Sequence, residues 1–363
     1  MLSRFPLEIL EYILHKLSLK TLVLCTSVCK QWKSIIADPV FISNHIGHTC
    51  LLRQWRKIGE EFQFQESYSL LLDNNRFDLV TTFEYPLSDR CNHPTFSQLV
   101  GTCNGLVCLY NLGLDFIIWN PTIRKYFLLP VRRLANLSYY GFGFDSRNND
   151  FKVVGLAGNP GYEVAVFSLA TRCWKIFTGS RIPSFMLKEL LFEKGNSMFK
   201  DGLLHWAVMT NKTHENFVLT FDLAEETFGE IMLPECLRAR ENIVSVLGGG
   251  NLLTVIHSAS SAYTMYKEDF HIWIMKEYGI VESWTKVYTG FARKLSKPLG
   301  FSKRGEVLLH CQRTGKIIAV DEGKKPRKDV EIIVNGEYAS LSYHIESLFL
   351  LDKSTRDGDI ISY

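Results

Sequence analysis

Residues 220–234 read Thr-Phe-Asp-Leu-Ala-Glu-Glu-Thr-Phe-Gly-Glu-Ile-Met-Leu-Pro: a short β-rich run, a polar turn, and a second run that carries an aromatic residue. Three further segments share this layout, and they begin at Ile117, Val166 and Ile272. One aromatic anchor can be aligned in each of the four: Trp119, Trp174, Phe228 and Trp284. The anchors recur about every 55 residues, although Trp119 precedes its turn whereas the other three follow theirs.

Strands led by glycine lie between these anchors, in Asn104-Gly-Leu-Val-Cys, Asp201-Gly-Leu-Leu-His, Gly250-Asn-Leu-Leu-Thr and Arg304-Gly-Glu-Val-Leu. No long amphipathic helix separates them, which argues against parallel βαβ units. A period near 50 residues that holds several strands and no helix is typical of β-propeller blades. Residues 47–352 therefore predict a propeller of about six blades, with a β-sandwich of chance spacing as the alternative and residues 353–363 as a C-terminal tail.

Residues 1–46 follow a helical period instead. Ile9, Leu10, Ile13, Leu14 and Leu17 form an apolar stripe. Ser18 and the Asp38-Pro39 pair are helix-start signals, so three or four short helices are expected. A unit this small cannot bury all of its apolar positions internally. Either a partner or the rest of the chain covers the remainder, and the spacing does not choose between the two. The predicted fold class is multidomain, a small helical module followed by an all-β propeller.

Composition limits the functional classes. The 363 residues are 46% hydrophobic with a net charge of +3, which excludes disorder and disfavours a nucleic-acid partner. Nine scattered cysteines without a C-x-x-C pair indicate reduced thiols and no zinc site. The N-terminus lacks a signal-peptide core, and no apolar run is long enough to span a membrane. We therefore expect a cytoplasmic or nuclear protein with no membrane insertion, no metal and no cofactor.

The N-terminal string from Phe5-Pro-Leu-Glu-Ile-Leu through Val28-Cys-Lys-Gln-Trp to Asp38-Pro-Val-Phe resembles an F-box. The remainder is similar to the F-box-associated, kelch-like region of a large plant F-box family. The matching pieces are Asn104-Gly-Leu-Val-Cys, Trp119-Asn-Pro-Thr, Tyr140-Gly-Phe-Gly-Phe-Asp, Asp150-Phe-Lys-Val-Val, Trp273-Ile-Met-Lys-Glu-Tyr-Gly, Glu282-Ser-Trp-Thr-Lys and Glu346-Ser-Leu. Relatives of this kind act in pollen self-incompatibility or in defence signalling, and these motifs are common to both groups.

The resemblance implies a substrate-recognition subunit of an SCF-type ubiquitin ligase, in which the F-box docks on a Skp-family adaptor that bridges to a cullin. The adaptor-facing residues it implies are Phe5, Pro6, Ile9, Leu10, Ile13, Leu14, Leu17, Val28 and Trp32. Several of them are also candidates for the core of the helical module. The family usually has Leu-Pro where this chain has Phe5-Pro6, and a second Leu-Pro where it has Leu17-Ser18, and adaptor binding is expected to survive both departures.

The target protein is expected to contact propeller loops, for which the candidates are Arg132, Arg133, Tyr139, Tyr162 and Tyr263. An adaptor-bound scaffold acting outside degradation is one alternative, and a propeller enzyme is another. No hydrolase, P-loop or zinc-protease motif supports an enzyme.

Three further features have a structural explanation as well as a functional one. His205, His257 and His310 are expected to be hydrogen-bonded strand residues rather than metal ligands. Gly248–Gly250 suits a hairpin turn better than an anion cradle. The basic run Lys324–Lys328 fits a nuclear-import signal or a solvated loop.

Overall fold

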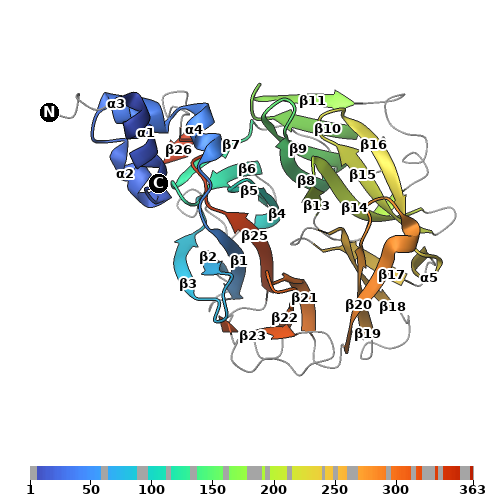
Figure 1. The fold of residues 1–363 in the computed structure, drawn as a ribbon. Coiled ribbons are helices and arrows are strands. Elements are labelled where there is room, and N and C mark those ends of the chain that lie inside the picture. Colours follow the sequence, from blue (N-terminus) through green and yellow to red (C-terminus); the bar gives the residue numbers. More distant parts are fainter. Residues whose placement is uncertain are drawn as a thin grey trace.

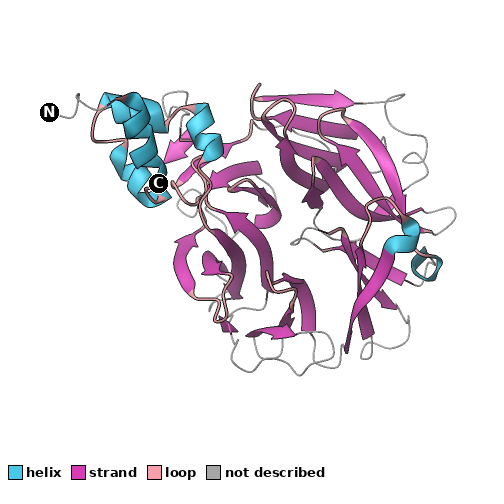
Figure 2. Ribbon diagram, viewed as in Figure 1, coloured by secondary structure: helices cyan, strands magenta, loops and turns pink. Residues whose placement is uncertain are grey.

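A computed structural model describes residues 6–58, 64–87, 97–111, 116–130, 137–157, 163–177, 190–192, 197–210, 215–238, 242–247, 252–259, 269–291, 296–311, 316–320, 332–333, 338–351 and 360–362. These residues form a small group of helices at the N-terminus and six antiparallel sheets arranged in a ring (Figure 1). Helices are nearly confined to the N-terminal group, and strands build the ring (Figure 2). The predicted helical module followed by a six-bladed β-propeller is confirmed, and the sandwich alternative is excluded.

The helical module contains α1 (Leu7–His15), α2 (Leu19–Cys25), α3 (Lys30–Ile36) and α4 (Pro39–Asn44). Local capping explains where they start. The hydroxyl of Ser18 accepts a hydrogen bond from Thr21 N at 3.3 Å, and the carboxylate of Asp38 accepts one from Val40 N at 2.8 Å. Pro39 occupies the first turn of α4, where its missing N–H costs nothing.

The strands of the six blades are given in order from the centre of the ring outward. Blade 1 contains β25 (Tyr338–Ile345), β1 (Thr49–Ile58), β2 (Phe64–Leu72) and β3 (Leu79–Glu84). Blade 2 contains β4 (Ser97–Cys103), β5 (Leu106–Asn111), β6 (Phe116–Asn120), β7 (Lys125–Leu128) and β26 (Ile360–Ser362). Blade 3 contains β8 (Leu137–Asp145), β9 (Asp150–Ala157), β10 (Glu163–Ser168) and β11 (Cys173–Phe177).

Blade 4 begins with β12 (Leu190–Phe192) and β13 (Met198–Lys200), which both pair with β14 (Leu203–Thr210), and continues with β15 (Asn216–Asp222) and β16 (Thr227–Met232). The short helix α5 (Glu235–Arg238) follows it. Blade 5 contains β17 (Asn242–Val246), β18 (Thr254–Ala259), β19 (Asp269–Met275), the 3₁₀ turn η5 (Val281–Ser283) and β20 (Trp284–Phe291). Blade 6 contains β21 (Ser296–Phe301), β22 (Val307–Cys311), β23 (Lys316–Val320) and β24 (Ile332–Ile333).

Left-handed turn residues explain the repeat seen in the sequence. Asn104-Gly105 and Asp201-Gly202 take positive φ between the first two strands of blades 2 and 4, which fits the tight hairpin that Asn-Gly and Asp-Gly favour. Arg124, Arg172 and Glu226 take positive φ at the same place in the outer hairpins of blades 2, 3 and 4. The polar turns of the repeat are thus blade hairpins.

The aromatic anchors occupy two different strand positions. Trp174, Phe228 and Trp284 lie in the outermost strands β11, β16 and β20, whereas Trp119 lies in β6, one strand further in. Strand register pairs Trp119 with Tyr126, as it pairs Phe167 with Trp174 and Phe221 with Phe228. The true counterpart of Trp174 in blade 2 is therefore Tyr126, which explains the looseness of the first interval.

Two strands from the C-terminus close the ring. β25 pairs with β1 along its whole length, from Thr49 opposite Ile345 to Arg56 opposite Tyr338. β26 then pairs with β7 at the outer edge of blade 2. The prediction that residues 353–363 form a tail is wrong for Ile360–Ser362, because the exposed edge of β7 gives their backbone groups a pairing partner.

Antiparallel pairing assigns the connections to two faces. In blades 2, 3 and 4, the hairpin from first to second strand and the hairpin from third to fourth strand lie on the same face of the ring, here called the hairpin face. The helical module joins this face, because Thr49 and Ile345 are paired at that end of blade 1. The connections from second to third strand and from blade to blade start on the opposite face.

The buried Lys152 of blade 3 links blades 3 and 4. Lys152 Nζ lies 3.0 Å from a carboxylate oxygen of Asp145 and donates a hydrogen bond to Leu223 O at 2.6 Å. Burial alone would raise the pKa of Asp145, but hydrogen bonds from Asn148 and Lys152 outweigh it and lower that pKa. Glu226 bridges this lysine, at 3.4 Å, to the exposed Lys175.

Replacing Lys152 by methionine should lower the free energy of unfolding by about 3 kcal/mol, because the Asp145 carboxylate is left buried without its cation. Lys175→Met is the matched control, since it removes the exposed partner of the same Glu226 and should cost at most about 1 kcal/mol. Urea unfolding at pH 7 measures both. Equal costs for the two variants would contradict a role for the buried Lys152 in linking the blades.

Candidate adaptor-binding surface and central cavity

Helix α1 has one covered side and one uncovered side. Leu10 and Leu14 are 2% and 0% exposed and pack with Leu22 and Ile36 in the core of the helical module. Ile9, Tyr12 and Ile13 are 45%, 64% and 42% exposed. We call these three residues the outer side of α1. Large apolar side chains this exposed on consecutive turns indicate a surface that a partner covers.

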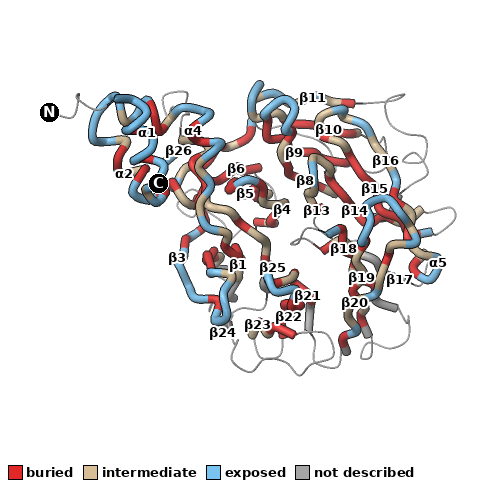
Figure 3. The backbone as a smooth tube through the Cα atoms, viewed as in Figure 1, coloured by how far each residue is buried: buried red, intermediate tan, exposed pale blue. Residues whose placement is uncertain are grey.

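The predicted adaptor-facing residues divide by burial. Pro6, Ile9, Ile13 and Val28 are exposed, and Leu17 and Trp32 are half-buried (Figure 3). Leu10 and Leu14 are buried, so the structure favours the alternative that they hold the helices together. Phe5 lies outside the described residues. Direct contact with an adaptor stays a prediction for the exposed members.

Sequence reasoning did not single out Leu7, Tyr12 and Leu24, which are also exposed apolar residues of this module. The apolar stripe pointed to one side of α1, and that stripe is wide enough to contain both core and surface positions. Tyr12 could have been found from its position three residues after Ile9, since residues three apart lie on the same side of a helix.

Aromatic stacking supports the module behind α1. The ring of Phe41 stacks on His15 at 4.3 Å and on His45 at 5.5 Å between centroids. Burial, and then the nearby His15, lower the pKa of His45. The stack joins α1 to the end of α4 and so fixes the direction in which the chain leaves the module.

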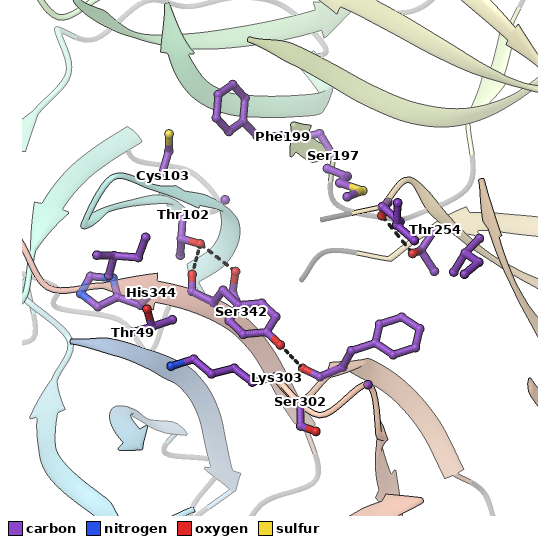
Figure 4. A pocket seen from close by; sticks show the side chains of 18 of the residues that line it. Thr49, Thr102, Cys103, Ser197, Phe199, Thr254, Ser302, Lys303, Ser342 and His344 are labelled. Carbon is purple, nitrogen blue, oxygen red and sulfur yellow. Dashed lines mark hydrogen bonds between the residues drawn. The ribbon is translucent and has the colours of Figure 1, made fainter. Parts of the chain in front are cut away.

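The propeller encloses a central cavity of about 890 Å³. Its walls include Thr102 of β4 and Ser342 of β25, both on innermost strands (Figure 4), and Tyr288 of the outermost strand of blade 5. The hydroxyls of Thr102 and Ser342 lie 2.8 Å apart, and Tyr343 donates a hydrogen bond to Phe301 O at 2.7 Å. These contacts tie blade 1 to blades 2 and 6. Lys303 is the only Lys, Arg, Asp or Glu among the described residues that line the cavity.

The three strand histidines lie on β14, β18 and β22, the second strands of successive blades. His205 is hydrogen-bonded to Met198 O at 3.1 Å and to the hydroxyl of Tyr278 at 2.7 Å, as expected for a strand residue with satisfied ring nitrogens. His257 stacks on His271 of the neighbouring strand β19. In the part of the chain that the structure describes, no three His, Cys, Asp or Glu side chains come close enough together to hold a metal ion.

One of the five predicted target-binding residues lies in the described structure. Tyr139 is a half-buried residue of β8 that packs against the apolar layer between blades 3 and 4. Arg132, Arg133, Tyr162 and Tyr263 lie outside the described residues, as do Gly248–Gly250 and Lys324–Lys328. Target binding by these residues stays a prediction.

The chain thus consists of a helical module with an uncovered apolar side, joined to a closed propeller. Residues 2–44 match the F-box domain, and residues 57–348 match the family described as the F-box associated beta propeller domain. The chain belongs to this family of F-box proteins.

Known F-box proteins are similar to this chain over most of its length. The chain is 29% identical to the F-box protein CPR1 of Arabidopsis thaliana, over 89% of this chain and 84% of that protein. An F-box/kelch-repeat protein of the same plant is 27% identical, over 80% and 82% of the two chains. Among solved structures, a hypothetical selenium-binding protein from Sulfolobus tokodaii aligns with a TM-score of 0.42 and 11% identity, over 80% of this chain and 76% of that one. None of the helices in the described residues is long and apolar enough to cross a membrane.

His344 of β25 is a buried imidazole whose protonation should destabilise the propeller. Its side chain is buried, neither ring nitrogen has a hydrogen-bond partner among the described residues, and burial lowers its pKa to about 4. The ordinary value is 6.5, so the folded state resists protonation that the unfolded chain accepts. This group therefore supports folding above pH 6.5, and its contribution is lost as the pH falls toward 4.

His344→Leu should flatten the pH dependence of the unfolding free energy between pH 6.5 and pH 4 by up to about 1.4 kcal/mol per pH unit. Urea unfolding at a series of pH values measures the slope. His48→Leu, at an exposed position in the linker, is the control and should keep the wild-type slope. An unchanged slope in His344→Leu would show that this imidazole does not set the acid sensitivity.

Proposed function

We propose that this protein is the substrate-recognition subunit of an SCF-type ubiquitin ligase, with the F-box bound to a Skp-family adaptor and the propeller bound to a target protein. The observation that carries the proposal is the outer side of α1. The propeller covers other parts of the helical module but leaves Ile9, Tyr12 and Ile13 in contact with solvent. Burying them in an adaptor supplies the apolar contact that the sequence requires.

Target recognition fits the face opposite the helical module. Strand ends at Ala157 and Glu163, and likewise at Thr210 and Asn216, lie on that face, where the chain leaves the described blades. In the sequence, the candidate target residue Tyr162 falls between Ala157 and Glu163. An adaptor on one face and a target on the other would not compete for space.

The proposed mechanism is connection rather than chemistry. By holding adaptor and target in one complex, the chain raises the effective concentration of target lysines near the conjugating enzyme, and no residue of this chain needs to touch the reacting thioester. The same arrangement would suit a protein acting in the cytoplasm or the nucleus.

Adaptor binding by purified protein tests the first half of the proposal. Ile9→Glu combined with Ile13→Glu should weaken binding to a Skp adaptor at least about 100-fold, because two charges would enter an apolar interface. Leu79→Glu is the matched control, since Leu79 is an exposed apolar residue of the propeller and should bind as wild type does. Isothermal titration calorimetry gives the affinities. Absent binding by the wild type, or full binding by the double variant, would contradict the proposal.

A reconstituted ligase separates a substrate receptor from a scaffold that acts outside degradation. With adaptor, cullin, conjugating enzyme and ubiquitin, a receptor should become ubiquitinated itself and should promote modification of a co-purified partner. Ile9→Glu with Ile13→Glu should reduce both by the same factor as binding. Adaptor binding without any ubiquitin transfer would favour the scaffold.

A further inference from the structure

The segment that follows β25, residues 346–351, runs between the helical module and the propeller, and we call it the strap. It begins with the Glu346-Ser-Leu motif and leads toward β26 at the edge of blade 2 (Figure 1). Leu348 and Leu350 are buried in the same apolar cluster as Leu14 and Leu22 of the helices. The strap is therefore part of the joint between the two domains.

Asn120, from the Trp119-Asn-Pro-Thr motif, holds the strap from the propeller side. Its side chain is 0% exposed, and its amide nitrogen donates hydrogen bonds to Ser347 O at 3.0 Å and Phe349 O at 2.8 Å. Its amide oxygen accepts a hydrogen bond from Thr122 N at 2.9 Å. Lys125 Nζ adds hydrogen bonds to Leu350 O and Leu351 O, both at 3.3 Å. One asparagine thus fixes its own turn and the strap together.

Three other motifs of the propeller contact the same strap. Gly105, from Asn104-Gly-Leu-Val-Cys, has φ of +80°, and a Cβ there would lie 2.1 Å from Ser347 Oγ, so only glycine fits. Phe349 packs edge-on against Phe151 at 5.0 Å between ring centroids and also contacts Phe144. Motifs spread over residues 104–154 therefore converge on the six residues of the strap.

The linker between the two domains contacts the strap from the other side. Gly47 N donates to Glu346 O at 2.9 Å, and Glu346 N donates to His48 O at 3.1 Å. A Cβ at Gly47 would lie 2.3 Å from Leu19 Cδ1 of α2 and 2.8 Å from Glu346 Cβ. The linker, α2 and the strap are therefore in direct contact, and the linker passes between helix and strap.

We propose that the strap locks the F-box at one orientation on the propeller, and that Asn120 is the positioning residue of this lock. A single linker at residues 45–48 leaves two domains free to rotate, whereas a buried segment that is hydrogen-bonded to both the linker and blade 2 restricts that freedom. A fixed orientation keeps a target at a constant distance from the conjugating enzyme. That consequence, but not the lock itself, rests on the proposed function.

Asn120→Asp tests the lock, because the carboxylate still accepts the Thr122 hydrogen bond but cannot donate to the strap. Asn216→Asp is the matched control, since Asn216 is also buried and donates to Leu237 O and Arg238 O in blade 4. Spin labels on the exposed thiols of Cys29 in the module and Cys173 in β11, with Cys91 and Cys236 changed to serine, report the distance between the domains by pulsed electron resonance.

We expect a narrow distance distribution in the labelled parent and in Asn216→Asp, and a distribution at least twice as wide in Asn120→Asp, even where both variants lose similar thermal stability. Lys125→Met removes two strap contacts more gently and should widen the distribution partially, which covers the case in which Asn120→Asp does not fold. A narrow distribution in Asn120→Asp, or in Lys125→Met where Asn120→Asp does not fold, overturns the lock.

Self-ubiquitination in the reconstituted ligase gives an independent readout. Asn120→Asp should spread modification over more lysines of the chain than wild type or Asn216→Asp does, with unchanged adaptor affinity. An identical lysine pattern in Asn120→Asp and wild type would overturn the positioning role. Failure of the wild type to bind the adaptor would instead refute the proposed function and leave the distance measurement as the test of the lock.

Discussion

Pairing of β25 with β1 is the constraint on which the rest of the structure depends. The two strands lie almost 300 residues apart in sequence and are hydrogen-bonded from Thr49–Ile345 to Arg56–Tyr338. Without this pairing, blade 1 loses its innermost strand, and blades 2 and 6 lose the surfaces that Ser342 and Tyr343 contact. Each blade buries its apolar residues only against its neighbours, so an open ring would expose two apolar sheet faces at once. Closing so long a loop costs entropy, and the many inter-blade contacts offset that cost together.

The same closure places the functional parts. On the hairpin face, β25 ends beside the start of β1. The linker and the strap therefore meet the ring at one point, and the helical module lies there. A different closing strand would have sent the strap to another blade, away from Asn120 and Gly105. The position of the F-box relative to the propeller is therefore a consequence of how the ring closes, and the outer side of α1 is presented to solvent as a result.

Much of the local structure could be predicted from the sequence, because its causes are local. Ser18 and Asp38 cap helices wherever they precede an apolar period, and Asn104-Gly105 and Asp201-Gly202 form tight hairpins by their own conformational preferences. The blade number could be predicted because each blade repeats the same pattern of strands and turns at a nearly constant spacing. Trp119 misled the alignment because an aromatic residue occupies both members of the register pair Trp119–Tyr126, and the sequence does not show which strand is the outer one.

The sequence by itself determined that helices are followed by blades, where the turns fall, and that α1 carries more apolar surface than its own core needs. Only the tertiary structure decided that Leu10 and Leu14 are covered while Ile9 and Ile13 are not, that Ile360–Ser362 join blade 2, and that four distant motifs meet at the strap. Periodicity and turn preference act over a few residues and are readable in a single chain. Which side of a helix is buried, and which strand edge receives a distant segment, depend on contacts between residues hundreds of positions apart, and those are fixed only when the ring closes.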